Sequence, residues 1–502
     1  MIGRFTAALA LVALLATPAL AQKGITVTIA PPADAVTMDP GRSTQVLTVN
    51  YFHNLYDTLT RWDTNLKLQP ALATAWKNVN ETTWEFTLRP GVKFHDGSPV
   101  TAEDVKATFE RNMTPGKTVV QSGFATFEAV QIPNPTTIRI VTKKPDPLVP
   151  VRVAQMGAYI LPAKLTTDEG VKELARKPVG SGAYKFVEWI RDDRLVMEAN
   201  REWWGWEKKA PPVERIVWKP IPDDFARLSA LQRGEVDVIT NVPPDQMKIV
   251  KTLSVSSSRF AVLSMNTTQA PLSDKRVRQA LHYALDVPSI VKNLYAGQGK
   301  PFTGGVADTD FGFNPALKPY PYDPARAKAL LAEAGYAGQE ITLHAGYGTM
   351  VSDKQLLETI ADMWSQVGVK AKVEMMEMAR RQKMNNDRLT PPNGMLLGNP
   401  QSTLLDIDGC LWRIFHPNGF NGKYWAGSQP GHRFHDIMES ARYSLDQKKR
   451  KDLYVEATRI VHDEKPWLEL FQEYVIYGVS KRVTFKPRAD FRLVAAEMTP
   501  AK

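Results

Sequence analysis

The most regular alternation of apolar and polar residues lies in the stretch WEFTLRPGVKFHDGSPVTAEDVKATFER, which begins at Trp84. Apolar residues alternate with polar ones over 84–88, an Arg-Pro-Gly triplet interrupts them, and the alternation resumes over 92–94 before Asp96-Gly97. Alternation indicates strands, and the two interruptions indicate turns. The pattern predicts a hairpin made of two strands.

The same stretch then changes to a helical period. Thr101 is placed to cap a helix, and Asp104 follows three residues later. Val105 and Phe109 are four residues apart, which puts them on one helical face. A capped helix starting at about residue 102 is therefore predicted.

Similar reasoning along the chain predicts alternating elements. The expected strands are residues 25–30, 136–141, 341–345, 369–373, 467–479 and 483–487. The expected helices include residues 352–367 and 447–462, with others starting after Ser273-Asp274, Asp286-Val287-Pro288 and Asp323-Pro324. A helix carrying Ala226 and Leu228 should end at Gly234. The strand, helix and strand of 341–373 form a βαβ unit, which predicts a parallel pair.

The first 21 residues have the composition of a secretory signal peptide. Arg4 forms a short basic head, an apolar run extends from Ala7 to Ala16, and Ala19-Leu20-Ala21 resembles a cleavage motif before Gln22. The run is too short to span a bilayer. No cysteine follows it that could carry a lipid. We predict a periplasmic protein that is not a lipoprotein.

Composition narrows the function classes. Cys410 is the only cysteine, so neither an intramolecular disulfide nor a cysteine-based metal site is expected. The 502 residues are 43% hydrophobic, enough for two or three domains with substantial cores. The net charge of +10 is spread through acid-containing stretches, so we predict no nucleic-acid partner.

Enzyme signatures are missing from the sequence. Gly-x-Ser-x-Gly, the phosphate-binding loop and His-Glu-x-x-His do not occur, and Gly297-Gln298-Gly299 lacks the third glycine of a dinucleotide loop. Adjacent acids such as Asp223-Asp224 are more typical of turns and caps. We predict neither an enzyme nor a cofactor.

Several of these motifs resemble one family, the family 5 solute-binding proteins of ABC importers. The block at 84–111 resembles the family signature, Met38-Asp39-Pro40 its Leu-Asp-Pro turn, and Gly180 to Tyr184 its Gly-Thr-Gly-Pro-Tyr turn. Arg233 to Asp237 is a further match. The resemblance covers essentially the whole chain after the signal peptide.

The resemblance implies an α/β, two-lobed periplasmic-binding-protein fold of the large type, with an extra domain and a cleft that closes by a hinge. It implies that lobe I is discontinuous, built from residues 22–50, 180–262 and 480–502. Residues 51–179 would form the extra domain, and residues 263–479 lobe II. It also implies a monomeric receptor that binds a di- or oligopeptide, or a similar small solute, and delivers it to an inner-membrane permease.

In relatives, an acid and several aromatic residues of the segment corresponding to 398–425 contact a peptide. The resemblance therefore implies Asp406 or Asp408 as the partner of an ammonium. A carboxylate would need a cation, because an unpaired buried charge is costly. The aromatic, cationic and secondary candidates in and around the expected cleft are Trp412, Tyr424, Trp425, Phe415, Arg413, Arg380, Arg381, Tyr347, Met350 and the turn around Val36.

Three alternatives remain at this point. The family pattern Asp-Pro-Asp is replaced here by Asp406-Ile407-Asp408, so the solute could also be an oligosaccharide or an opine-like compound. A nickel or metallophore receptor would use His416 or His432, with His435 three residues further on. The remote alternative is a secreted hydrolase. We predict no metal site, because His416, His432 and His435 are more typical of exposed surface histidines.

Overall fold

The computed structural model describes residues 24–206, 210–387, 394–417, 419 and 421–501. The predicted signal peptide lies outside the described residues. Among the described helices, no segment combines the length and the apolar character needed to cross a membrane.

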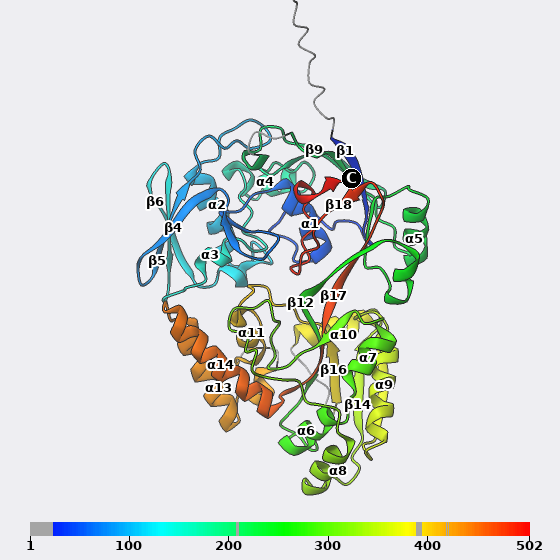
Figure 1. The fold of residues 1–502 in the computed structure, drawn as a ribbon. Coiled ribbons are helices and arrows are strands. Elements are labelled where there is room, and N and C mark those ends of the chain that lie inside the picture. The colour runs from blue at the N-terminus through cyan, green and yellow to red at the C-terminus, as the bar shows by residue number, and fades with distance from the viewer. Residues whose placement is uncertain (1–23, 207–209, 388–393, 418, 420, 502) are drawn as a thin grey trace, which may run out of the picture.

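The main sheet extends through two of the three parts of the molecule (Figure 1). Its strand order is β15, β14, β16, β12, β17, β11, β1, β10, β9, β8, with β13 paired to β17. The strands are β1 (Ile25–Ala30), β8 (Tyr184–Ile190), β9 (Arg194–Ala199), β10 (Val213–Trp218), β11 (Val238–Thr240), β12 (Thr252–Met265), β13 (Gly299–Pro301), β14 (Ile341–Gly346), β15 (Ala371–Met376), β16 (Gly394–Gly398) and β17 (Trp467–Val479).

Lobe I surrounds β1, which pairs in parallel with β10 and β11. Its core joins distant parts of the chain, because Val27, Tyr51 and Trp218 pack in one cluster with Tyr477 and Leu493. The helices of this part are α1 (Val46–Leu55) and α5 (Asp224–Gln232), and β18 (Val483–Thr484) pairs with β19 (Thr499–Pro500).

The extra domain contains a separate sheet with the order β4, β5, β7, β6. Its helix α2 covers an apolar core that includes Phe86, Phe109 and Ile140. Its elements are β2 (Thr60–Trp62), β3 (Leu68–Pro70), β4 (Ala73–Asn80), β5 (Thr83–Leu88), β6 (Phe127–Asn134), β7 (Thr137–Thr142), α2 (Ala102–Met113), α3 (Val149–Arg152) and α4 (Gly170–Leu174).

Lobe II forms the lower part of Figure 1. In its α/β half, β14 pairs in parallel with both β15 and β16. A helical half lies beside it, and its core contains the buried Cys410. The helices are α6 (Lys275–Tyr283), α7 (Val287–Leu294), α8 (Pro324–Glu333), α9 (Asp353–Ser365), α10 (Met378–Asn386), α11 (Leu411–Phe415), α12 (Gly422–Trp425), α13 (Gln429–Arg442) and α14 (Gln447–Glu464).

Two long strands connect the lobes. β12 and β17 run antiparallel from the Thr252–Gly478 pair, where β17 also meets β11, to the Ser264–Trp467 pair, where β12 also meets β16. Their register shifts between Ser256 and Phe260, so the residues between these two positions leave the ladder. The shift occurs where the chain passes between lobes, and it frees Arg259 from the regular alternation of the strand.

Most predicted elements are confirmed, including β1, β7, α5 to α9, α14, β17 and the parallel β14–β15 pair. Asp104 Oδ2 accepts hydrogen bonds from the backbone N–H and the hydroxyl of Thr101, each at 2.8 Å, as the capping pattern predicts. The predicted hairpin is wrong. β5 pairs with β4 and β7, whereas residues 92–94 contribute only an isolated bridge from Lys93 to Pro99.

Candidate functional site

Two cavities and a narrow crevice lie where lobe II meets lobe I and the extra domain. The inner cavity has a volume of 560 Å³ and lies beside the connecting strands, between Asn241 of lobe I and Thr349 of lobe II. The outer cavity has a volume of 590 Å³ and lies between Phe124 of the extra domain and Leu404 of lobe II. Both volumes are within the range of about 300–1,000 Å³ that is usual for small-molecule sites.

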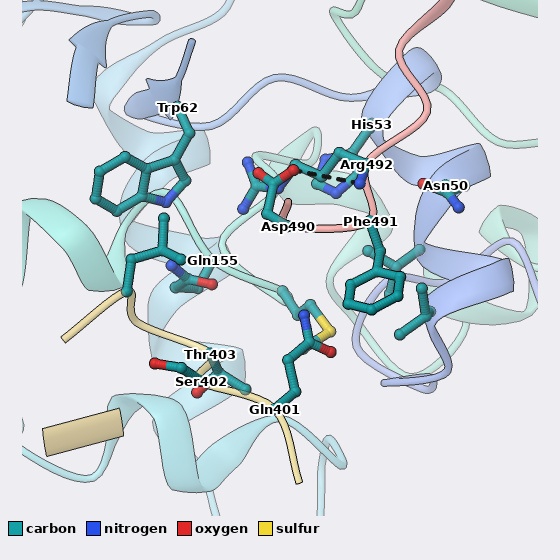
Figure 2. A pocket seen from close by; sticks show the side chains of 14 residues that line it. Asn50, His53, Trp62, Gln155, Gln401, Ser402, Thr403, Asp490, Phe491 and Arg492 are labelled. Atoms are coloured by element: carbon teal, nitrogen blue, oxygen red, sulfur yellow. Dashed lines mark hydrogen bonds and ion pairs between the residues drawn. The ribbon is translucent and has the colours of Figure 1, made fainter. Parts of the chain in front are cut away.

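The crevice connects the linings of the two cavities. It encloses 40 Å³ and shares Gln155 and Thr403 with the outer cavity and Phe491 with the inner one. Figure 2 shows the 401–403 segment of lobe II on one side and Trp62, Gln155 and Phe491 on the other. The cavities and the crevice therefore form one cleft between the lobes.

Arg259 lines both cavities because the register shift turns it out of the β12–β17 ladder. Its guanidinium carbon lies 4.4 Å from the ring centre of Phe491, a cation–π contact. Its Nε is buried and has no hydrogen-bond partner among the described residues. A buried donor of this kind favours an acceptor supplied by a ligand.

Glu473 lines the inner cavity from β17. Burial raises the pKa of its carboxyl above the usual value, although the nearby Arg259 and a hydrogen bond from Asn399 act in the opposite direction. Its Oε1 is buried and, like Oε1 of Gln298 in the same cavity, has no hydrogen-bond partner among the described residues. The inner cavity thus presents two acceptors to a donor group.

The outer part of the cleft presents unpartnered donors. Trp62 Nε1 and Gln155 Nε2 are buried donors without a partner in the described part of the chain. The outer cavity is lined by Arg152, Arg259 and Arg413 and, in the described part of the chain, by no acidic side chain. The inner cavity therefore combines unpartnered acceptors with Arg227 and Arg259, whereas the described lining of the outer cavity has cations and no acidic side chain.

Asp406 and Asp408 lie outside the lining of the cleft. Both are about 3% exposed, and Asp406 Oδ2 is 2.8 Å from Arg450 Nη2, while its Oδ1 accepts a hydrogen bond from Tyr454. Asp408 lies 3.1 Å from Arg442 Nη1 and 3.6 Å from Arg152 Nη2. Burial is the largest influence on Asp408 and raises the pKa of its carboxyl despite these two arginines. The protein itself supplies cations for both acids.

These acids belong to a group that we call the paired cluster: Asp146, Arg152, Asp406, Asp408, Arg442 and Arg450. Arg152 lies 2.7 Å from Asp146 within the extra domain and also faces Asp408 of lobe II. The paired cluster therefore joins the extra domain to lobe II, on the side of the cleft away from the connecting strands.

The other predicted site residues are dispersed. Arg413 lines the outer cavity, where its Nε donates a hydrogen bond to Gly409 O at 3.2 Å. Trp425 is buried against Phe415 and Phe434, and Trp412 Nε1 donates to Glu439 at 2.7 Å.

Met350 lines the inner cavity. The remaining candidates lie at or near the surface of the molecule. Tyr424 is half-buried beside Lys423, and Arg380 is exposed on α10. Arg381 donates to Leu397 O, while Val36 and Tyr347 are 46% and 58% exposed. For these residues and those of the preceding paragraph, a role in ligand binding remains a prediction.

Arg259, Glu473, Trp62 and Gln155 were not predicted from the sequence as site residues. Two of them had a visible signal, because Glu473 interrupts the apolar run of β17 and Arg259 precedes the apolar end of β12. A charge inside a largely apolar strand needs a partner or a function.

Two lobes that meet at a cleft and are joined by two long strands define a binding protein that closes on its ligand. The family described as "Bacterial extracellular solute-binding proteins, family 5 Middle" matches residues 67–422. The chain belongs to this family, as its motifs predict, and its two-lobed α/β fold is confirmed. It is a solute-binding protein of the ABC-importer type.

Three relatives illustrate the match. The glutathione-binding protein GsiB of Shigella boydii is 29% identical over 492 residues, covering 94% of this chain and 93% of GsiB. The periplasmic binding protein DppA of Helicobacter pylori, in complex with the peptide STSA, is 25% identical with a TM-score of 0.77, covering 95% and 98% of the two chains. CtaP of Listeria monocytogenes has a TM-score of 0.85 at 20% identity and covers 95% and 100%.

Proposed function

We propose that the protein is the periplasmic receptor of an ABC importer for a small peptide that carries at least one ammonium and one or more carboxylates. The observation that carries the proposal is the polarity of the cleft. Unpartnered acceptors of Glu473 and Gln298 line its inner cavity together with Arg227 and Arg259, whereas its outer cavity has three arginines and no acidic side chain among the described residues. A zwitterion that lies along the cleft satisfies both ends at once.

The orientation follows from the charges. The ligand's ammonium lies at Glu473 and its carboxylates at Arg259 and Arg413. Glutathione is the first candidate, because it has one ammonium and two carboxylates and because GsiB relatives are named for binding it. Asp406 and Asp408 then support the fold rather than the ligand, since Arg450, Arg442 and Arg152 already pair with them.

We further propose that residues 1–21 are removed on export and that the monomeric protein presents the intact ligand to its permease. Contacts from both lobes stabilise the closed form, and only ligands that touch both lobes shift the population toward it. No bond of the ligand is broken. Mass spectrometry of the ligand after release tests this point, because a hydrolase would return fragments.

Calorimetric titration tests the proposal, with unmodified glutathione, its N-acetylated form, its diethyl ester and unmodified dipeptides as ligands. Unmodified peptides should bind. N-acetylation should weaken binding because it removes the ammonium that pairs with Glu473, and esterification should weaken it because it removes the carboxylates that pair with the arginines. Arg259→Gln should weaken binding at least about 30-fold, because it removes one partner of a desolvated charge pair. Glu473→Gln should lower the affinity for the ligand with a free amine but leave the affinity for the acetylated form unchanged.

Arg380→Gln is the matched control, because Arg380 is an exposed arginine on α10 that lies outside the cleft lining. Its affinity should equal that of the unmodified protein. Binding of oligosaccharides or nickel chelates, combined with indifference to both substitutions in the cleft, would contradict the proposal.

A further inference from the structure

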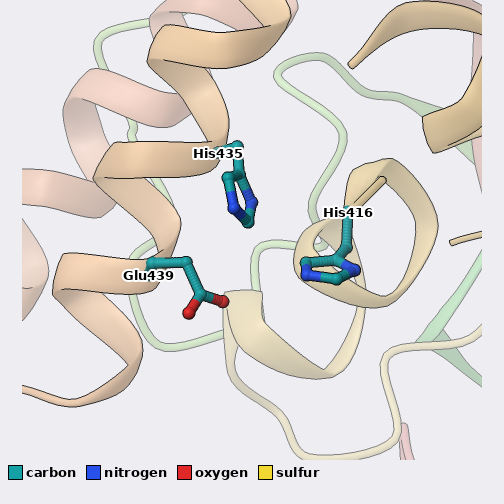
Figure 3. A group of neighbouring side chains, drawn as sticks. All are labelled: His416, His435 and Glu439. Carbon is teal, nitrogen blue, oxygen red and sulfur yellow. The ribbon is translucent and has the colours of Figure 1, made fainter. Parts of the chain in front are cut away.

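Three side chains with metal-binding atoms converge in the helical half of lobe II. His416 follows the end of α11, and His435 and Glu439 lie on α13. One ligand atom of each lies within 4.8 Å of the others, and all three residues are half-buried. Figure 3 shows the imidazole of His435 and the carboxylate of Glu439 on the side of α13 that faces His416.

The local sequence explains the convergence. His435 and Glu439 are four residues apart, so consecutive turns of α13 place them on one face. The imidazole of His416 stacks on the indole of Trp412, with ring centres 4.3 Å apart. Trp412 also donates from Nε1 to Glu439 Oε1 at 2.7 Å, which orients the carboxylate and leaves its second oxygen for another partner. One tryptophan thus positions two of the three groups.

The chemistry of the three groups fits a metal cation. His435 Nδ1 is buried and has no hydrogen-bond partner among the described residues. Each of the two histidines offers one ring nitrogen to the group. Glu439 supplies the negative charge that offsets a cation in a partly buried site.

We propose that His416, His435 and Glu439 form a site for a borderline divalent transition metal, of which Zn²⁺ is the representative. Two imidazole nitrogens and one carboxylate oxygen are a usual set for such ions, and they leave a fourth position for solvent or a small exogenous ligand. Mg²⁺ and Ca²⁺ prefer oxygen ligands and are excluded by the two imidazoles.

The site is separate from the ligand cleft, because none of its three residues lines the cavities or the crevice. A bound metal ion would link His416, which follows α11, to His435 and Glu439 of α13. It would also lie along α13 from Arg442, which contacts both Trp412 and Asp408. The proposal does not depend on the identity of the transported solute.

Competition with a chromophoric zinc chelator tests the site on untagged, chelator-treated protein. The unmodified protein should bind one Zn²⁺ per chain, and Zn²⁺ but not Mg²⁺ should raise its thermal midpoint. His435→Ala and Glu439→Gln should each lower the Zn²⁺ affinity at least 10-fold. Trp412→Phe keeps the ring but removes the donor to Glu439, so its affinity should fall by a smaller factor.

His432→Ala is the matched control, since His432 lies on the same helix but is exposed and outside the group. Its affinity should be unchanged. Because Glu439→Gln keeps size and the acceptor for Trp412, it separates loss of metal from loss of fold, and an unaltered thermal midpoint of the metal-free variant confirms folding. Absence of stoichiometric Zn²⁺ uptake, or an equal loss with His432→Ala, would overturn the proposal.

Discussion

The paired cluster and the cleft are both rich in buried charge, but they differ in where the partners come from. Within the paired cluster, Asp406 and Asp408 meet arginines of the same chain at 2.8 and 3.1 Å. In the cleft, Glu473 Oε1 and Arg259 Nε have no hydrogen-bond partner among the described residues. The carboxylates of Asp406 and Asp408 are satisfied by the fold, although Nη2 of Arg152 and Nε of Arg442 and Arg450 lack hydrogen-bond partners among the described residues. The Glu473 carboxylate in the cleft keeps an unpartnered oxygen, which is available for recognition.

The strongest test of this difference removes one charge from the paired cluster. Asp406→Asn leaves Arg450 buried without its carboxylate, so the free energy of unfolding should fall by about 3–5 kcal/mol. Urea denaturation measures this change. Calorimetry on the folded fraction should give the wild-type ligand affinity. Lost affinity with unaltered stability would mean that Asp406 contacts the ligand, as first predicted from the sequence.

A second test uses a buried acid that forms no ion pair with the described residues. Asp310 is buried beside Ser402 and Ala307, and burial raises the pKa of its carboxyl to about 7. Because this value exceeds that of the unfolded chain, the folded state holds the proton more tightly between about pH 4 and pH 7. The stabilisation from Asp310 is complete below about pH 4 and is lost as pH rises through 7.

Asp310→Asn should remove this dependence. The shift of about three pKa units corresponds to a difference on the order of 4 kcal/mol between the variant and the unmodified protein at pH 8, and to little difference at pH 4. Denaturation series at both pH values measure it. Parallel stability curves for the two proteins would show that Asp310 does not titrate in this range.

The smallest expected effect concerns Arg413, an exposed arginine at the outer cavity. Arg413→Gln should lower the affinity for a ligand with a carboxylate by no more than about fivefold, since exposed charge pairs contribute about 0.2–1 kcal/mol. The loss should shrink as salt is raised, because solvent-exposed charges are screened. Titrations at low and high salt test this, and a loss as large as that of Arg259→Gln would place Arg413 at the centre of recognition.

The sequence predicted local structure well because its signals are local. Thr101 and Asp104 are three residues apart and cap α2 as expected. The hairpin prediction failed because strand pairing depends on partners elsewhere in the chain. β5 pairs with β4 and β7, and both of these strands lie outside residues 84–94. The family motifs predicted the two-lobed fold, whereas periodicity alone would not have indicated a lobe built from separate segments of the chain.

The candidate site was harder to predict for the same reason. Nothing near Asp406 reveals that Arg450 will reach it from α14, and a pair of acids beside aromatic residues resembles a binding segment. In the cleft, Arg259 of β12 lies near Glu473 of β17. These two strands are far apart in sequence and are adjacent only in the sheet. Contacts between distant segments decide which charges are left for a ligand.

The single thiol of the chain gives the molecule an unusual practical property. Cys410 is buried in the core of lobe II, and burial raises the pKa of its thiol, so it stays protonated and protected from reagents. Any cysteine introduced at the surface would be the sole reactive one. Paired spin labels at exposed positions such as Val36 and Tyr347 would then report the separation of the lobes directly, without first removing a native cysteine.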